Sequence, residues 1–281
     1  MRRFFSSGIL FFLAAICVPL GCADEETGKD DKAARGGFGA DGPETGDLAE
    51  VLAKYVKESG LVDYAGLAAD RDGLDGWINE AKSLDADGYR DPSNARVEKL
   101  AFWINFYNAA TLQLIVEFYD DDLTSIQDLE DVGGAPPWDY FLFQVGGEKL
   151  TLNEIEHEII RPIFAEPRIH FAVNCASISC PRLRTEPYQG DILDDQLEAA
   201  AVEFADSDDH VRFDEMSGTV AVNPVVDWYR DDFGGISGVY DFIGARLNDE
   251  AKIEAWNALT PNDLTFFSYD WSLNDSGSSS D

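Results

Sequence analysis

The spacing of apolar residues predicts helices over much of the first half of the chain. Between residues 47 and 57 apolar positions recur every three or four residues, which predicts a short amphipathic helix. From about residue 94 to 118 they cover most of the helical circumference, which predicts a long, central and buried helix. Thr151 and Glu154 form a capping box, so we expect another helix to begin there and to end near Pro162.

Strand patterns follow in the second half. Residues 168–174 alternate, with Ile169, Phe171 and Val173 on one face and His170, Ala172 and Asn174 on the other, which predicts an inner strand. The remaining patterns predict strands at 138–145 and 264–271, a hairpin of 211–213 with 219–222, and helices at 193–204 and 240–247.

Helices and strands alternate irregularly, without a repeated βαβ unit, which favours an α+β fold over a doubly wound α/β fold. We expect a single domain, residues 47–273, with the central buried helix packed on a mixed or antiparallel sheet. The polar residues 274–281 and the glycine-rich, charged residues 22–46 lack the apolar side chains for a core, so we expect a disordered tail and a disordered tether.

The first 21 residues have the pattern of a signal peptide. Arg2 and Arg3 precede an apolar run at 8–18 that is too short to span a membrane as a helix. Gly21-Cys22 resembles the end of a bacterial lipoprotein box, although Pro19 stands where that box usually has Leu. We therefore expect export and lipidation of Cys22. Ala23, in place of Asp, favours the periplasmic side of the outer membrane, or its outside.

Charge and missing motifs exclude several functions. The 54 acidic residues outnumber 21 basic ones, for a net charge of −33, so the chain would repel nucleic acid and attract cations or basic partners. It has no Walker loop, dinucleotide fingerprint, Gly-x-Ser-x-Gly elbow or Cys-x-x-Cys motif. We therefore expect none of the common NTPases, nicotinamide enzymes, serine hydrolases or thioredoxins, and we predict no cofactor.

If Cys17 leaves with the signal peptide and Cys22 carries lipid, the exported domain keeps Cys175 and Cys180. An oxidising compartment makes a disulfide the first hypothesis for this pair. Free or redox-active thiols are the second hypothesis. A third is a metal site with His170, for which these few ligands are insufficient.

The neighbours of Cys175 favour thiol chemistry. His170 and Asn174 lie on one face of the predicted strand, and Cys175 begins the loop at its end. A thiol near an imidazole has a lowered pKa and becomes a nucleophile, while a third polar group orients the ring. The candidates for this third group are Asn105 and Asn108 of the central helix, and Asp270. The small residues 176–179 provide amides that could stabilise an anion.

A second cluster, residues 154–158, combines acidic side chains with His157. Its spacing occurs in di-iron sites, which need a second copy that the chain lacks. It also approaches the zinc-protease helix, but Arg161 stands where the second histidine ligand must be. We therefore predict no metal site here, and expect a capped helix with a Glu/Arg ion pair on its exposed face.

Several segments resemble the domain of unknown function 547 family, and they appear in that family's order. They are 61–64, 101–109, 150–157, 168–181, 227–229 with 232–233, and 269–274. Within them Asn174, Cys180, Glu156, His157 and Arg168 are candidate binding residues. The resemblance implies no settled reaction. The helix followed by a histidine-bearing strand is faintly similar to papain and transglutaminase, but asparagine stands where those enzymes place cysteine.

Two hypotheses for the function remain open. The first is an exported, lipid-anchored domain that performs thiol-dependent hydrolysis, acyl transfer or redox chemistry at Cys175 and His170. The second is a non-catalytic module of the cell envelope, in which the same polar groups surround a structural Cys175–Cys180 disulfide and the surface binds a partner. The sequence identifies no protein partner or substrate.

Overall fold

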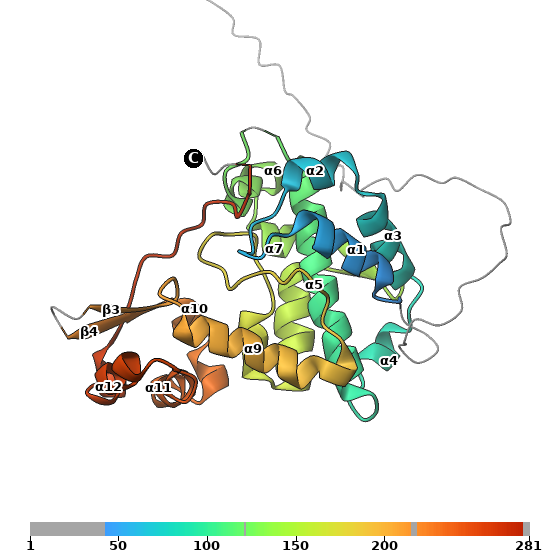
Figure 1. Cartoon of the computed structure of the whole chain (residues 1–281). Helices are drawn as coiled ribbons and strands as arrows, with labels where there is room; N and C mark the ends of the chain where they lie inside the picture. Colours follow the sequence, from blue (N-terminus) through green and yellow to red (C-terminus); the bar gives the residue numbers. More distant parts are fainter. Residues whose placement is uncertain (1–42, 121, 215–217, 278–281) are drawn as a thin grey trace, which may run out of the picture. The chain divides into compact units, whose positions relative to one another are not determined.

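The computed structural model describes residues 43–120, 122–214 and 218–277, all of which lie in the compact unit Gly37–Asp281 (Figure 1). The predicted signal peptide, Cys22 and nearly all of the tether lie outside the described residues. Asn274, expected at the start of a polar tail, is buried, and its side-chain oxygen accepts a hydrogen bond from the hydroxyl of Tyr64 at 2.8 Å.

Helices dominate the described residues. The α-helices are α1 (Gly46–Tyr55), α2 (Tyr64–Ala69), α3 (Asp72–Ala81), α4 (Ala86–Arg90), α5 (Arg96–Phe118), α6 (Glu130–Gly133), α7 (Pro137–Tyr140), α8 (Leu152–Glu154), α9 (Leu193–Asp206), α10 (Val225–Trp228), α11 (Ile236–Gly244) and α12 (Glu250–Asn257). A π-helix, η2 (Ile155–Phe164), continues α8. The 3₁₀ helices are η1 (Ile126–Leu129), η3 (Pro167–Phe171), η4 (Gly190–Ile192), η5 (Arg230–Phe233) and η6 (Pro261–Asp263).

The described strands form two small sheets. One is the antiparallel pair β1 (Phe143–Val145) and β2 (Glu148–Leu150). In the other, β4 (Thr219–Val222) pairs antiparallel with β3 (Val211–Asp214) and parallel with β5 (Leu264–Phe266). The predicted α+β class and the predicted hairpin are confirmed.

Helix α5 is the buried central helix that the periodicity predicts, and Figure 1 shows it in green near the middle of the cartoon. Its most extensive contacts are with other helices, namely α2, α3, η2 and η4. Its aromatic residues, including Trp103 and Phe106, are fully buried. Because the helix is buried on nearly every side, its polar side chains must find partners inside the protein.

A second apolar cluster surrounds the three-stranded sheet. Side chains from α9, β3, β4, α11 and α12 form it, and its largest fully buried members are Trp256 and Phe204. Phe171 of η3 also belongs to this cluster, while its neighbour Ile169 belongs to the larger cluster around α5. The segment that carries His170 therefore lies where the two clusters meet.

The predicted inner strand at 168–174 is wrong. Pro167 begins the 3₁₀ helix η3, and the side chain of Glu166 caps it by accepting a hydrogen bond from the amide of Arg168. Ile169, His170 and Phe171 are each only 1% exposed, so the alternating letters do not separate a buried face from an open one. His170 and Asn174 consequently do not project from one strand face.

Two other strand predictions are wrong over part of their length. Within 138–145, Pro137 starts helix α7, and only residues 143–145 form a strand. Within 264–271, only residues 264–266 pair with β4. Beyond them the chain pairs with the loop after Cys175, since the amide of Ile178 donates to the carbonyl of Ser272 at 2.8 Å.

The capping box at Thr151 and Glu154 is confirmed, and it starts a helix of unusual width. Helix α8 passes into the π-helix η2, which contains Pro162. Single π-turns are frequent at functional sites because the wider turn displaces side chains from their usual helical positions. No helix of the described residues combines the length and the apolar character needed to cross a membrane.

Candidate functional site

A cavity of about 280 Å³ lies beside Cys175 and His170. Six of the fifteen described residues that line it are tyrosine or tryptophan. The residues that line it are Tyr107, Trp138, Asp139, Asn153, Glu156, His170, Val173, Cys175, Cys180, Pro181, Val225, Trp228, Tyr229, Tyr269 and Trp271. An apolar cavity with a few converging polar groups is the usual form of a small-molecule site.

Asn174 shapes the loop that presents Cys175. Its side-chain oxygen accepts a hydrogen bond from the amide of Ala176 at 2.8 Å, and its side-chain nitrogen donates to the carbonyl of Pro181 at 2.9 Å. These bonds hold Ala176 at a φ of 60°, the left-handed region that residues with a Cβ rarely adopt. Such strain persists only where the surroundings fix the backbone, and it is concentrated at functional sites.

The C-terminal segment brings a hydroxyl to Cys175. Backbone hydrogen bonds join Ile178 to Ser272 and Ser179 to Asp270, which places Tyr269 over the loop. The Sγ of Cys175 lies 3.2 Å from the hydroxyl of Tyr269 and 3.2 Å from that of Ser177. The Ser177 hydroxyl in turn donates to Tyr269 at 3.0 Å.

These neighbours lower the pKa of the Cys175 thiol. The hydrogen bond from the Cys180 thiol is the largest cause; burial opposes it, and the hydroxyls of Ser177 and Tyr269 add to it. The pKa falls below its ordinary value, to about 7. Cys175 is half-buried and lines the cavity, so a thiolate there is accessible to a ligand.

Cys175 and Cys180 are both free thiols in this structure, so the expected disulfide is not shown. The amide of Cys175 donates to the Sγ of Cys180 at 3.1 Å. Burial, followed by the adjacent Cys175 sulfur, raises the pKa of Cys180 well above its ordinary value. The two thiols are therefore unequal: Cys175 is ionised more readily, and Cys180 stays protonated.

His170 is oriented by an aspartate. Its Nε2 lies 2.7 Å from the Oδ2 of Asp232, which also receives the guanidinium of Arg161 at 2.7 Å. The ring stacks on Tyr229 with a centroid separation of 3.9 Å. The hydrogen bond from His170, more than that from Arg161, holds the pKa of Asp232 well below its usual range. In a neutral ring whose Nε2 donates to this carboxylate, Nδ1 carries the lone pair.

Two buried acceptors in the cavity lining lack a partner. His170 Nδ1 and Glu156 Oε1 have no hydrogen-bond partner among the described residues. They lie 4.0 Å apart, which is too long for a hydrogen bond. The side chain of Glu156 is 7% exposed and that of His170 is fully buried. Both residues line the cavity, and the two atoms are therefore available to the donor groups of a ligand that enters it.

His170 and Cys175 line the same cavity, as expected, yet no hydrogen bond joins them in the described part of the chain. The pKa of Cys175 is lowered by Cys180, Ser177 and Tyr269. The hypothesis that the imidazole activates this thiol is therefore replaced by activation from the loop's own side chains.

The three groups expected to orient His170 have other partners. Asn108 donates to the carbonyl of Ala172 at 2.9 Å and accepts from the amide of Asn174 at 2.8 Å. Asn105 brackets the backbone of Tyr188 in the same way. Neither lines the cavity, and Asp270 accepts a hydrogen bond from the amide of Ser272. Asp232, and none of these three, is the polar group that orients the ring of His170.

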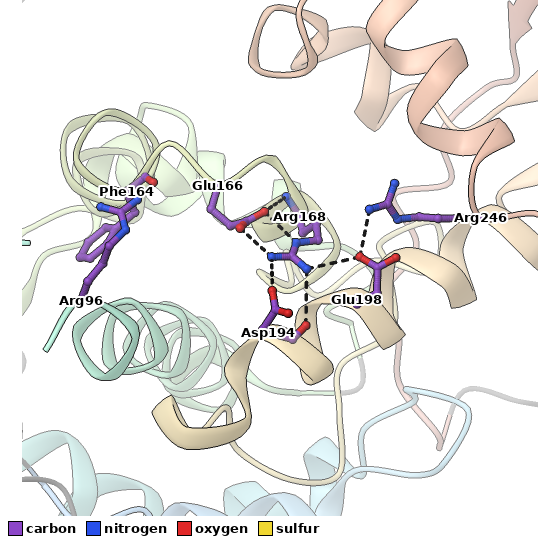
Figure 2. A network of polar contacts seen from close by, with 7 residues as sticks. All are labelled: Arg96, Phe164, Glu166, Arg168, Asp194, Glu198 and Arg246. Atoms are coloured by element: carbon purple, nitrogen blue, oxygen red, sulfur yellow. Dashed lines mark hydrogen bonds and ion pairs between the residues drawn. The ribbon is translucent and has the colours of Figure 1, made fainter.

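Arg168 lies in an ion-pair network outside the cavity lining (Figure 2). Its guanidinium contacts Glu166 at 2.8 Å, Asp194 at 2.7 Å and Glu198 at 3.3 Å, and Figure 2 shows that these join η3 to α9. Arg246 extends the network by binding Glu198 at 2.9 Å. This arrangement indicates that Arg168 fastens the segment before His170.

His157 is exposed, and its Nδ1 contacts Arg161 at 2.5 Å. Arg161 pairs with Asp232, so the ion pair expected between Arg161 and a glutamate of the same helix is replaced. Among the residues described, no group of three or more histidine, cysteine, aspartate or glutamate side chains could hold a metal ion.

Three of the four amides at 176–179, where an anion site was expected, already have partners. The amides of Ala176, Ile178 and Ser179 bind Asn174, Ser272 and Asp270 respectively. Because each of these three already donates to an oxygen of the protein, they are not free to stabilise an incoming anion.

Sequence reasoning missed Asp232, Tyr269 and Tyr229 as site residues. All three lie far along the chain from Cys175, and contacts between distant segments have no local pattern. They do occur within the short segments 227–229, 232–233 and 269–274 that resemble the known family. The resemblance of those segments to the family was the only signal in the sequence that could have pointed to these three residues.

Comparison with known proteins adds one match. No curated protein and no solved structure matches the chain. Residues 92–205, from just before α5 to α9, match the model of a family described as "Protein of unknown function, DUF547". This stretch contains Glu156, His170, Cys175 and Cys180, whereas Asp232 and Tyr269 lie beyond it. The match supports, over residues 92–205, the resemblance to the domain of unknown function 547 family.

Proposed function

We propose that the protein is a thiol-dependent acyl transferase or hydrolase, with Cys175 as nucleophile and His170 as general base. The observation that carries the proposal is the presence, in one cavity, of a thiol with a pKa of about 7 and an imidazole whose Nδ1 has no partner among the described residues. A thiolate and a positioned base are the two groups that acyl transfer through a thioester requires.

The chemistry divides between the two residues. The thiolate of Cys175 attacks the carbonyl carbon of an ester or amide, a C–S bond forms, and the bond to the leaving group breaks as that group takes a proton from water. The hydroxide that this leaves is neutralised when His170 returns to solvent the proton that it gains in the second step. In the second step Nδ1 of His170 takes a proton from water or another acceptor. That acceptor attacks the thioester, its bond to carbon forms, and the C–S bond breaks to return the thiolate. Asp232 holds the ring throughout.

Acylation by an activated ester tests this proposal. Incubation with p-nitrophenyl acetate should place one acetyl group on Cys175, detected by peptide mass spectrometry, and none on the Cys175→Ala variant. In the His170→Gln variant the acetyl group should still form but should accumulate, because its removal needs the base. No acetylation of Cys175, or removal at the same rate in both proteins, contradicts the proposal.

The contact between the two thiols favours a second candidate function, thiol–disulfide exchange. Cys175 would attack a disulfide of a partner molecule, releasing one of its sulfurs as a thiolate. Cys180 would then lose its proton and attack the mixed disulfide, leaving a Cys175–Cys180 disulfide and the reduced partner. The Cys180→Ala variant, assayed at pH 9 where Cys175 is still ionised, separates the candidates: it should keep acyl transfer and should trap the mixed disulfide. A non-catalytic module would show neither reaction.

We also propose that the chain is exported and anchored through lipid on Cys22. The support is the sequence alone: two arginines, an apolar run at 8–18 and Gly21-Cys22. Metabolic labelling with a radioactive fatty acid should label the wild-type chain and should not label the Cys22→Ser variant. Equal labelling of both would contradict the proposal.

A further inference from the structure

We propose that the cavity binds the protonated primary amine of its ligand, between Glu156 and His170. This inference deepens the proposed function, on which it rests, by naming a substrate class for the same site: small amines that act as the acyl acceptor. The proton that Nδ1 of His170 takes in the second step is then a proton of the bound ammonium. Three features of the cavity support the inference: two unpartnered acceptors, the sign of the charge around them, and the aromatic lining.

The two acceptors are placed so that one donor group can serve both. Glu156 Oε1 and His170 Nδ1 are 4.0 Å apart, are buried, and lack partners among the described residues. A primary ammonium has three N–H donors and no acceptor, so a nitrogen between these two atoms can donate to each. A carboxylate or phosphate has only acceptors and would leave both atoms unpaired.

The charge of the lining also favours a cation. No lysine or arginine is among the described residues that line the cavity, whereas Asp139 and Glu156 are. The guanidinium of Arg161 shares Asp232 with His170, and its charge is paired with that carboxylate. The whole chain has a net charge of −33, which raises the local concentration of cations around it.

The aromatic lining adds a third reason. Trp138, Trp228 and Trp271 line the cavity; Trp271 contacts both of the others and stacks on Trp228 at a centroid separation of 5.8 Å. Tryptophan faces attract cations through their quadrupole, and their apolar surface accommodates the alkyl chain of an amine. A neutral alcohol of the same size would gain the apolar contact alone.

The test compares three probes of equal size on the Cys175→Ser variant of the full chain, which lacks the nucleophilic thiol. Isothermal titration at pH 7 with butylammonium, 1-butanol and butyrate should show butylammonium binding at least tenfold more tightly than the other two. Tryptophan fluorescence gives a second readout, because three tryptophans line the cavity.

Glu156→Gln, which keeps the side-chain shape, should abolish the tenfold preference for the amine over the alcohol. Glu158→Gln is the matched control, since Glu158 lies two residues away on the same helix and is exposed. It should keep the preference. A thermal melt of each variant reports whether the fold is retained. Equal binding of amine and alcohol, or an unchanged preference in Glu156→Gln, would overturn the inference.

The outcomes separate this inference from the proposed function. Amine binding without acylation of wild-type Cys175 would leave the subsite intact and remove the acyl-transfer proposal. Acylation without preference for the amine would do the reverse. In the wild-type protein, butylammonium should also slow the alkylation of Cys175 by iodoacetamide, whereas equal concentrations of 1-butanol should leave the rate unchanged.

Discussion

Replacing Asp232 with asparagine should damage both stability and catalysis, because this carboxylate links two parts of the site. Its Oδ2 receives His170 Nε2 and Arg161 Nε, each at 2.7 Å, and its Oδ1 receives a second guanidinium nitrogen at 2.9 Å. The substitution Asp232→Asn would keep the size of the side chain but would remove the charge and turn one acceptor into a donor.

The expected loss of stability follows from these bonds. Hydrogen bonds to a charged group contribute about 1.5–3 kcal/mol, and the 26% exposure of this side chain lowers that contribution, so we expect Asp232→Asn to cost about 2 kcal/mol. For a domain of this size that is a fall of roughly 4–8 °C in Tm. Loss of the correct ring orientation should slow removal of the acyl group by about 10²-fold or more.

The pH dependence has a defined sign. The folded protein holds the pKa of Asp232 below its usual range, so this group contributes stability above the unfolded pKa of about 4. That contribution is lost as the pH falls further. The difference in unfolding free energy between wild type and Asp232→Asn should therefore be largest near pH 6 and should shrink below pH 4. Denaturant titrations at several pH values measure it.

Asp231→Asn is the matched control, because Asp231 is the exposed neighbour and the substitution removes the same charge. It should change Tm by less than about 2 °C, as most surface substitutions lie within about 0.5 kcal/mol. If Asp232→Asn behaves like Asp231→Asn in both stability and acyl removal, the role assigned to Asp232 is refuted.

Three further predictions concern the surroundings of the site. Cys180→Ala removes the largest cause of the low Cys175 pKa and should raise the midpoint of Cys175 alkylation by about one unit, whereas His170→Ala should leave it unchanged. Burial lowers the pKa of His210 to about 4, so the neutral ring stabilises the fold above pH 6.5, and this stabilisation is lost as the pH falls to 4. Over that interval the free energy of unfolding of the wild type, measured with denaturant, should fall by roughly 3 kcal/mol more than that of His210→Gln. Asn108→Ala leaves the carbonyl of Ala172 and the amide of Asn174 buried without a partner, so it should lower the free energy of unfolding by about 3 kcal/mol. The Tm should fall and the pH midpoint of Cys175 alkylation should change; an unchanged Tm would show that Asn108 does not support this loop.

The sequence predicted those parts of the fold whose signal is local. Helix α5 has apolar residues around nearly its whole circumference, and the capping box at Thr151 identifies the residue at which a helix begins. The hairpin of β3 and β4 alternates and turns at Gly218, whose φ is 65°. In each case the pattern and the structure depend on residues close together in the chain.

The site depended on signals that are not local. The alternation at 168–174 suggested a strand, but packing from both apolar clusters buries successive residues, and Pro167 with Glu166 starts a 3₁₀ helix. The chemistry of the cysteine and the histidine singled them out, and the structure places both in the lining of one cavity. Their partners, Asp232 and Tyr269, come from segments 62 and 94 residues away along the chain, and only the folded backbone brings them together.

The pH dependence of Cys175 alkylation in the wild-type protein tests the central claim most directly. The reduced protein would be treated with iodoacetamide from pH 5 to pH 10, and the rate at Cys175 followed by peptide mass spectrometry. A midpoint near pH 7, with Cys180 unreactive over the same range, is what the structure predicts. A midpoint at or above the ~8.5 of an ordinary cysteine would show that Cys175 is no activated nucleophile, and the proposed function would fall with it.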